Sequence, residues 1–460
     1  MQGKKTSAIS QKIATGAQLF LVGFAVFVAG FNVAQRDSVK RTMGSLHSGE
    51  LQAEMLPYAR EAYDKHLTVK TELPDALQKG AILIGSQFGL DPSILLVDGQ
   101  GTVLHRWHME GKVFNTEMLN WWRDYSLEKG FSVDDAHLLP GGDVIFIQLA
   151  TDLNSYRGQR LARMDKDSHI IWQVTGNFHH FLDITGDRIY ALSSALAESL
   201  PEIAPPLRNV RYLDDYVEAY TLDGKQTGKW SITQAFARSP YHTWLSSFEI
   251  ERADVQRIQT SDGRTLYDLF HPNSVQCLSE KQAKAIPQAR AGDILLSFKE
   301  LSAIAVLRPE TGEIVWAAKG PWKHQHNVQV LADGKLYMYD NQGKQVVVAD
   351  ADEIAAEEKQ SRVLCYDPFG NRIEEIFAER DYFSAFLGDY DPLPDGSWVI
   401  SYSMPGRVIV ASPEKKIVWQ LRTIPDMQRA TVPYRKILSF MHYYPDSALA
   451  FLQSGQEKKP

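Results

Sequence analysis

The sequence predicts an all-β protein built as a six-bladed β-propeller, and three observations support this prediction. From about residue 80 onward, short apolar segments alternate with glycine-containing turns, and long helical patterns are few. A turn followed by a strand, and a strand that ends in tryptophan, recur in the same order along the chain. Six units of about four short strands each are typical of a propeller, in which every blade packs against its neighbours.

The repeated unit has two recognisable parts. The first is a tight turn followed by an apolar strand, with copies at 139–146, 184–190, 331–337 and 393–400. The second is a strand, a turn and a strand that ends in an aromatic residue, at Trp107, Trp172, Trp230, Trp316, Trp419 and, in a weaker copy, Phe377. We expect the indole rings to fill the space between blades.

The repeats also define the domain organisation. The units cover 81–115, 134–178, 179–234, 268–322, 323–380 and 384–424. A length of 460 residues would by itself predict about three domains of roughly 150 residues. The repeats replace that estimate with one propeller domain at 79–440, followed by a C-terminal tail at 441–460. Inserts at 195–212, 236–266 and 280–290 are expected to form loops at the top or rim.

The N-terminal region carries a predicted membrane anchor. Residues 14–35 are uncharged and largely apolar, long enough to span a bilayer core. Lys4, Lys5 and Lys12 precede this segment, so the N-terminus is expected to stay in the cytoplasm. A cleavable signal peptide, with Ala29 or Ala34 near the cut site, is the alternative.

Either interpretation exports the rest of the chain. We predict a cytoplasmic tip and single transmembrane helix at 1–37 and a short helical stalk at 38–78, in which apolar residues recur at helical spacing. The propeller would then face the periplasmic, extracytoplasmic side of the inner membrane.

Composition excludes several functions. The net charge is -7, from 49 basic and 56 acidic residues, and no long basic patch supports nucleic-acid binding. Cys277 and Cys365 are the only cysteines, too few for a disulfide framework, and no CxxC or Cys/His metal spacing occurs. One bridge between them stays open as an alternative to two small buried thiols. The patterns predict neither a metal nor a cofactor.

Polar residues stand before the inner strand of several units. His179 and Asp389 lie seven residues before the turn glycine, and His326 lies eight residues before it. Asp135 lies seven residues before its own turn glycine, and His180 stands next to His179. In the fourth unit the same place is held by the segment His271-Pro272-Asn273-Ser274, which Lys299 follows. Inner strands begin near the central channel, so three units deliver histidine to one predicted mouth.

One such histidine alone would most often be a turn cap, but three at equivalent positions favour a functional site. Imidazole is a good metal ligand, yet no HExxH spacing is present. Asn273 and Lys299 both donate hydrogen bonds, and this favours an anionic group as the ligand.

Blades four and five also carry a resemblance. The segment from Gly292 to Trp316 leads into Gln325-His326-Asn327 and ends at Tyr339-Asp340-Asn341. With His271-x-Asn273-Ser274 and the pair His179-His180 upstream, this pattern is similar to that of the bacterial arylsulfotransferase family. The likeness covers about residues 80–440, and its specific part lies in blades four and five.

The resemblance implies an exported six-bladed propeller that moves sulfo groups between phenols without a nucleotide donor or other cofactor. It implies that His326 is the nucleophile, which becomes transiently sulfated. His271, Asn273 and one of His179 and His180 would contact the sulfo group. Lys299 stands where the family pattern has Arg, so the charge is kept but the planar bidentate fork is lost. We add Asp389 to the substrate-binding set.

The residue types suit this chemistry. A neutral imidazole can attack sulfur, and His271, Asn273 and Lys299 would stabilise the sulfo oxygens. A second histidine can protonate the departing phenol and then deprotonate the acceptor, which gives a ping-pong cycle. The partners would be an aryl sulfate donor and a phenolic or other hydroxyl acceptor.

Two other functions stay open. The departure at Lys299 and the predicted anchor favour a non-catalytic, membrane-anchored propeller that binds a protein partner or an anionic glycan. The segment Thr311–Trp316 resembles repeats of quinone-cofactor dehydrogenases. Those enzymes normally have eight blades and a Ca²⁺ site, and the sequence indicates neither.

Overall fold

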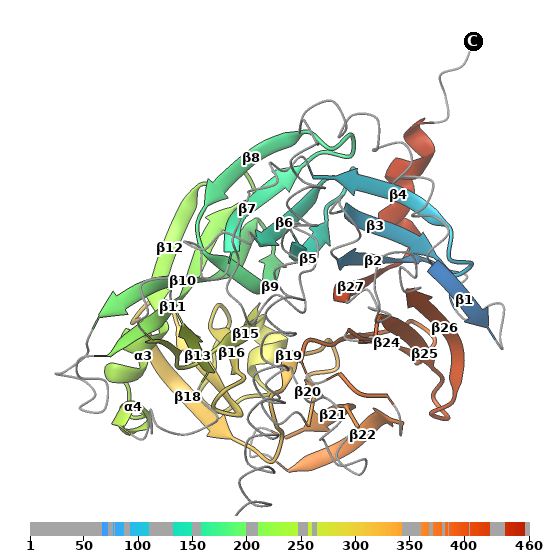
Figure 1. The fold of residues 1–460 in the computed structure, drawn as a ribbon. Helices are drawn as coiled ribbons and strands as arrows, with labels where there is room; N and C mark the ends of the chain where they lie inside the picture. Colours follow the sequence, from blue (N-terminus) through green and yellow to red (C-terminus); the bar gives the residue numbers. More distant parts are fainter. Residues whose placement is uncertain are drawn as a thin grey trace, which may run out of the picture. The chain divides into compact units, whose positions relative to one another are not determined.

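The computed structural model confirms the all-β, six-bladed propeller (Figure 1). The chain divides into two compact units, Met1–Glu61 and Ala62–Pro460. The structure describes residues 67–71, 77, 79–86, 93–109, 132–149, 158–198, 210–246, 256–259, 265–342, 360–367, 371–379, 382–384, 386–403, 405–423 and 438–455. The predicted transmembrane helix at 14–35 lies outside these residues, and no helix among them is long and apolar enough to cross a membrane.

Each blade is an antiparallel sheet whose strands run outward from the centre in a fixed order. Blade I contains β27 (Leu438–Tyr444), β2 (Ala81–Ser86), β3 (Ser93–Asp98) and β4 (Val103–His108). Blade II contains β5 (Ser132–Leu138), β6 (Val144–Leu149), β7 (Gly158–Met164) and β8 (Ile170–Thr175). Blade III contains β9 (Phe178–Thr185), β10 (Arg188–Glu198), β11 (Arg211–Thr221) and β12 (Gln226–Ser231).

The second half follows the same order. Blade IV contains β15 (Pro272–Cys277), β16 (Ile294–Phe298), β17 (Ala303–Arg308) and β18 (Glu313–Lys319). Blade V contains β19 (His326–Val330), β20 (Leu336–Asp340), β21 (Arg362–Tyr366) and β22 (Arg372–Ala378). Blade VI contains β23 (Asp389–Pro392), β24 (Trp398–Tyr402), β25 (Arg407–Ala411), β26 (Ile417–Thr423) and an outer fifth strand, β1 (Leu67–Thr71).

The two ends of the domain close the ring. Strand β27 pairs with β2 and becomes the innermost strand of blade I, while β1 pairs with β26 in blade VI. These strands correct two predicted boundaries. β1 is a strand, although it lies within the range 38–78 that was predicted to be a helical stalk. Apart from β1 and residue 77, that range lies outside the described residues. β27 continues past residue 440, where a tail was predicted, and the 3₁₀ helix η4 (Asp446–Gly455) follows it.

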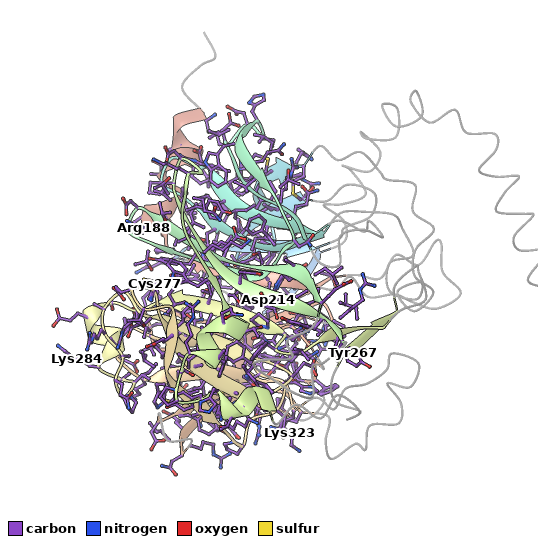
Figure 2. The ribbon with its side chains drawn as sticks, turned by 90° about the vertical axis from the view of Figure 1, so that its left-hand side faces the viewer. Arg188, Asp214, Tyr267, Cys277, Lys284 and Lys323 are labelled. Carbon is purple, nitrogen blue, oxygen red and sulfur yellow. The ribbon has the colours of Figure 1, made fainter. Side chains whose placement is uncertain are left out.

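The predicted inserts contain short elements of their own. Between blades III and IV lie α3 (Ile232–Ala237), α4 (Thr243–Ser246), β13 (Gln256–Gln259) and β14 (Thr265–Asp268). Strand β14 pairs with β11 in parallel and extends blade III. Helix α5 (Glu280–Ala283) begins at a capping box on Ser279. Figure 2 shows Tyr267 of β14 and Lys284, next to α5, at opposite sides of the propeller.

Tryptophans join neighbouring blades, as predicted. Four indole nitrogens each donate a hydrogen bond of 2.7–2.9 Å to a carbonyl in a turn of the next blade: Trp107 to Gly142, Trp172 to Leu222, Trp230 to Pro309 and Trp419 to Gly99. Each ring therefore buries apolar area and satisfies its only donor at the same interface.

Side chains of the inner strands join each blade to the next around the central channel. The hydrogen-bonded pairs are Asp135 with Leu182 N, Asp183 with Cys277 N, Ser274 with Val328 N, Asn327 with Asp389, Asp389 with Met441 N, and His442 with Asp135. The series returns to its starting strand. Buried polar groups thus close the ring at its centre, where side chains from all six blades meet.

The two cysteines form no bridge. Cys277 in β15 and Cys365 in β21 are both free and buried. Burial raises the pKa of both thiols, which keeps them protonated and unreactive.

Candidate active site at the channel mouth

β-Bulges lie at or next to the predicted site residues in three inner strands. The register between the first two strands of a blade shifts in β9 at His180 and Phe181, in β15 at Asn273, and in β19 at Asn327. His180, His271 and Asn327 also have positive φ values of 57°, 50° and 44°. L-residues rarely adopt this conformation, and such strain is concentrated at functional sites.

The bulges bring three histidines from blades III, IV and V together. The ring centroids of His180 and His271 are 4.9 Å apart, and those of His180 and His326 are 6.5 Å apart. His179 lies behind this cluster. Its Nδ1 is 2.8 Å from His180 Nδ1, and its Nε2 is 3.5 Å from Asp215 Oδ1. Of the two candidates in blade III, His180 therefore faces the other histidines.

His326 is buried and held in one tautomer. Its Nδ1 lies 2.8 Å from Asn341 Oδ1 and 3.0 Å from the His324 carbonyl, two acceptors, so Nδ1 carries the proton. Nε2 then has the lone pair, and the backbone N–H of Leu387 donates to it over 3.3 Å. The Asn341 amide nitrogen donates to the carbonyls of Ser384 and Leu387, which fixes the amide orientation.

The surroundings keep His326 neutral. Burial lowers its pKa to about 3; the hydrogen bond to Asn341 opposes this shift, and the nearby charge of Lys299 adds to it. A neutral imidazole with a defined Nε2 lone pair can act as a nucleophile near neutral pH.

His271 has a carboxylate partner. Its Nδ1 lies 2.6 Å from Oδ2 of the buried Asp268, at the end of β14. A carboxylate in this position orients the ring and stabilises its protonated form, so His271 can act as a general acid and base. Sequence reasoning missed Asp268, because it lies next to an insert and outside the turn-and-strand motif.

The predicted sulfo-binding side chains are also near the cluster. Asn273 donates through Nδ2 to the Gln325 carbonyl at 2.6 Å, and its buried Oδ1 has no hydrogen-bond partner among the described residues. Lys299 Nζ lies 3.0 Å from Oε1 of the buried Glu300. The backbone N–H of Lys299 donates to the His271 carbonyl at 3.2 Å, which ties blade IV's second strand to the site.

Asp389 makes its contacts elsewhere. Its carboxylate accepts hydrogen bonds from Asn327, from its own neighbour Tyr390 and from Met441. Burial raises its pKa to about 8. The structure thus places Asp389 in the channel beside blade I and gives it no contact with the three clustered histidines among the described residues.

A family model identifies the family of the chain. The model for arylsulfotransferase (ASST) matches residues 135–424, more than half of the chain. The chain belongs to the arylsulfotransferase family. No curated protein matches it. Membership of this family supports an aryl sulfotransferase activity in general terms.

Solved structures resemble this chain only distantly. A protein of unknown function from Bacteroides caccae has 11% identity and a TM-score of 0.42, covering 79% of this chain and 98% of that one. Virginiamycin B lyase from Staphylococcus aureus has 10% identity and a TM-score of 0.34, covering 77% of this chain and 87% of that one.

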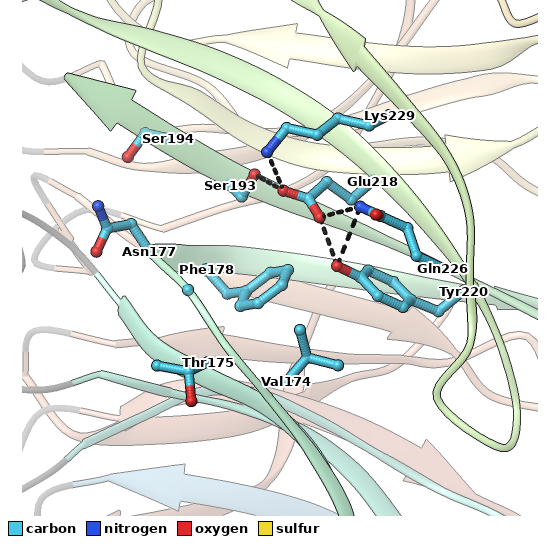
Figure 3. A pocket seen from close by; sticks show the side chains of 11 residues that line it. Val174, Thr175, Asn177, Phe178, Ser193, Ser194, Glu218, Tyr220, Gln226 and Lys229 are labelled. Atoms are coloured by element: carbon cyan, nitrogen blue, oxygen red, sulfur yellow. Dashed lines mark hydrogen bonds and ion pairs between the residues drawn. The ribbon is translucent and has the colours of Figure 1, made fainter.

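The chain also has a cavity of about 400 Å³ between blades II and III. It is lined by residues of β8 and β9 and by side chains of β10, β11 and β12 (Figure 3). Glu218 stands at its centre and accepts hydrogen bonds from Ser193, Tyr220, Gln226 and Lys229. Since four donors already engage this carboxylate, Glu218 is a poor candidate for a general base.

Proposed function

We propose that this protein transfers a sulfo group from an aryl sulfate donor to a phenolic or other hydroxyl acceptor, through a sulfohistidine at His326. The observation that carries the proposal is the buried, neutral His326, whose Nδ1–H is engaged by Asn341 so that Nε2 retains its lone pair. His180 of blade III lies beside it, and His271 of blade IV packs against His180.

In the first half-reaction, His326 Nε2 attacks the sulfur in line with the aryl oxygen. The N–S bond forms, the S–O bond breaks, and the electron pair of that bond goes to the aryl oxygen. His271, protonated and oriented by Asp268, gives this oxygen a proton, so the free phenol leaves. The Leu387 N–H shifts away from Nε2 as the sulfur approaches.

In the second half-reaction, His271 takes the proton of the acceptor hydroxyl. The acceptor oxygen attacks sulfur, the N–S bond breaks, and its electron pair returns to His326. No proton or electron is gained or lost over the cycle. The second half-reaction is the first in reverse with a different alcohol, so one site serves both.

The sulfo oxygens need donors that are in place before the reaction. Lys299 supplies a positive charge, and the second N–H of the Asn273 amide is available beside its bond to Gln325. The pairing of Lys299 with Glu300 offsets part of that charge. We infer that the sulfo group competes with Glu300 for the ammonium when the donor binds.

We also propose that the site lies on the extracytoplasmic side of the inner membrane. With residues 14–35 as an anchor, the channel mouth would meet its donors outside the cytoplasm. This placement is part of the proposal and agrees with a mechanism that uses no nucleotide donor.

The test is covalent labelling of the full chain. Incubation with 4-nitrophenyl sulfate and no acceptor should release a burst of 4-nitrophenol and add one sulfo group to the peptide that contains His326. His326→Asn keeps a donor for Asn341 but has no nucleophilic nitrogen, so burst and label should both vanish. His169→Asn, at a histidine exposed on the surface, is the matched control and should behave as wild type.

Turnover that survives in His326→Asn would overturn the nucleophile assignment. Wild-type protein that binds aryl sulfate without any burst or label would instead favour the non-catalytic, anion-binding propeller.

A further inference from the structure

A second histidine cluster lies where blades I and II meet, at the closure of the ring. Nε2 of His442 in β27 is 2.7 Å from Asp135 Oδ1, and Nε2 of His137 in β5 is 3.4 Å from Asp135 Oδ2. The two rings stack with their centroids 4.3 Å apart. One carboxylate thus has an imidazole nitrogen near each of its oxygens, at hydrogen-bond distance only for His442.

The three side chains have the spacing of a metal site. One donor atom from each lies within 4.8 Å of the others. Donors in a tetrahedral site with bonds of about 2.0–2.2 Å are roughly 3.4 Å apart. The 2.7 Å and 3.4 Å separations reach that geometry with small rotations of the imidazole rings, and a water can take the fourth position.

His137 provides an independent observation. Its Nε2 is buried and has no hydrogen-bond partner among the described residues, although it points at the Asp135 carboxylate. A buried polar nitrogen without a partner is costly, and coordination would satisfy it. His137 and Asp135 are two residues apart in β5, so both side chains lie on the same face of the strand.

The groups around the cluster match those that support metal ligands. His442 Nδ1, on the far side of the ring from Asp135, lies 3.8 Å from Asp389 Oδ2. A carboxylate behind a ligating histidine orients the ring and raises its basicity. Asp135 is itself fixed by the N–H groups of Ala136 and Leu182. Asp391 adds further negative charge nearby.

We propose that Asp135, His137 and His442 bind a divalent transition metal of the zinc class, which fastens β27 to β5 and so closes the propeller. Two imidazoles and one carboxylate suit Zn²⁺ and its neighbours better than Ca²⁺ or Mg²⁺, which prefer oxygen ligands. The ligands come from the last strand of the domain and from blade II. The metal would act on the stability of the ring, separately from the chemistry at His326.

The experiment measures metal content and thermal stability of the full chain. Protein stripped with EDTA is dialysed against about 10 µM Zn²⁺, a concentration at which a micromolar site is mostly filled. We expect one Zn²⁺ per chain by atomic emission and a Tm that rises with added Zn²⁺ and falls again with EDTA. Ni²⁺ and Co²⁺, tested in the same way, should also bind.

His137→Ala removes the ligand whose Nε2 makes no hydrogen bond, so the Asp135–His442 hydrogen bond and the fold should survive. Zn²⁺ affinity should drop at least about tenfold, and the Tm response should disappear. His137→Gln serves as a second variant if the alanine protein is unfolded by circular dichroism. His169→Ala is the matched control, because His169 also pairs with a carboxylate, Asp165, but lacks a third ligand.

Zn²⁺ binding that is equal in wild type and in the folded His137 variant would place the metal elsewhere and overturn the proposal. So would wild-type protein that takes up none of the three metals, which would leave the cluster as an ion pair.

Discussion

In the chain without a bound metal, two buried histidines of the same propeller have opposite protonation. His326 is held by the neutral amide of Asn341, and burial lowers its pKa to about 3. Burial acts in the same direction on His442, but the charges of Asp135 and Asp389 outweigh it and raise the pKa to about 10. The comparison shows that the hydrogen-bond partner, more than burial, decides whether a histidine here is a nucleophile or a cation.

His271 is the intermediate case, a histidine with a carboxylate partner inside the active site. Asp268→Asn keeps the size of the side chain and removes its charge, so His271 should become a weaker acid–base catalyst. We expect kcat to fall about a hundredfold with phenyl sulfate, whose leaving group needs a proton. The fall should be about tenfold with 4-nitrophenyl sulfate, whose leaving group is stable as an anion. Steady-state rates with both donors check this, and equal losses would assign Asp268 a purely structural part.

Exchanging the partner of His326 tests the comparison directly. Asn341→Asp places a carboxylate beside His326, as at His442, and should raise the pKa of His326 by roughly 1–3 units. The acid limb of kcat/KM for nitrophenol release should therefore move toward neutral pH. Asn341→Ala removes the hydrogen bond that raises this pKa and adds no charge, so it should lower activity and move the limb, if at all, toward lower pH. If the acid limb lies at the same pH in both variants, the residue at position 341 does not control the pKa of His326.

The neutral state of His326 also has a consequence for stability. Because its folded pKa is about 3 and its unfolded value is near 6.5, the unfolded chain binds this proton more readily between those pH values. The resulting contribution is full above pH 6.5 and is lost as pH falls. From pH 7 to pH 5, wild type should lose about 2 kcal/mol more unfolding free energy than His326→Asn, at about 1.4 kcal/mol per unit.

Urea unfolding of both proteins at the two pH values checks this difference. Groups that titrate equally in both proteins cancel in the comparison. Parallel pH dependence would mean that His326 is not buried as a neutral ring.

The repeated features of the fold could be predicted from sequence, whereas the pairing of β27 with β2, which closes the ring of blades, could not. The turn glycines and the tryptophans recur because every blade packs on the next in the same way, as the bond from Trp107 to Gly142 illustrates. Blade I is assembled from both ends of the domain. Strand β27 carries neither the turn motif nor a tryptophan, so nothing in its local sequence indicates that it completes a blade.

The candidate site shows the same division. His271 and His326 stand at equivalent repeat positions, and this periodicity made them visible. The choice between His179 and His180 depends on a bulge in β9, which the sequence does not reveal. His442 lies 307 residues from Asp135 along the chain, so only the closed ring brings the two together.

Lys299 offers the mildest test of the comparison, because it changes the cation near His326 and leaves the histidine and its amide partner in place. Lys299→Arg restores the residue type of the family pattern. The planar guanidinium can contact Glu300 and a sulfo oxygen at once, whereas the ammonium is a compact point charge. We expect KM for 4-nitrophenyl sulfate to fall by a few-fold, at most about tenfold for one gained charge-assisted hydrogen bond, with kcat nearly unchanged. Lys299→Met removes the charge at similar length and should raise KM instead. If both variants leave KM at the wild-type value, Lys299 serves only to neutralise the buried Glu300.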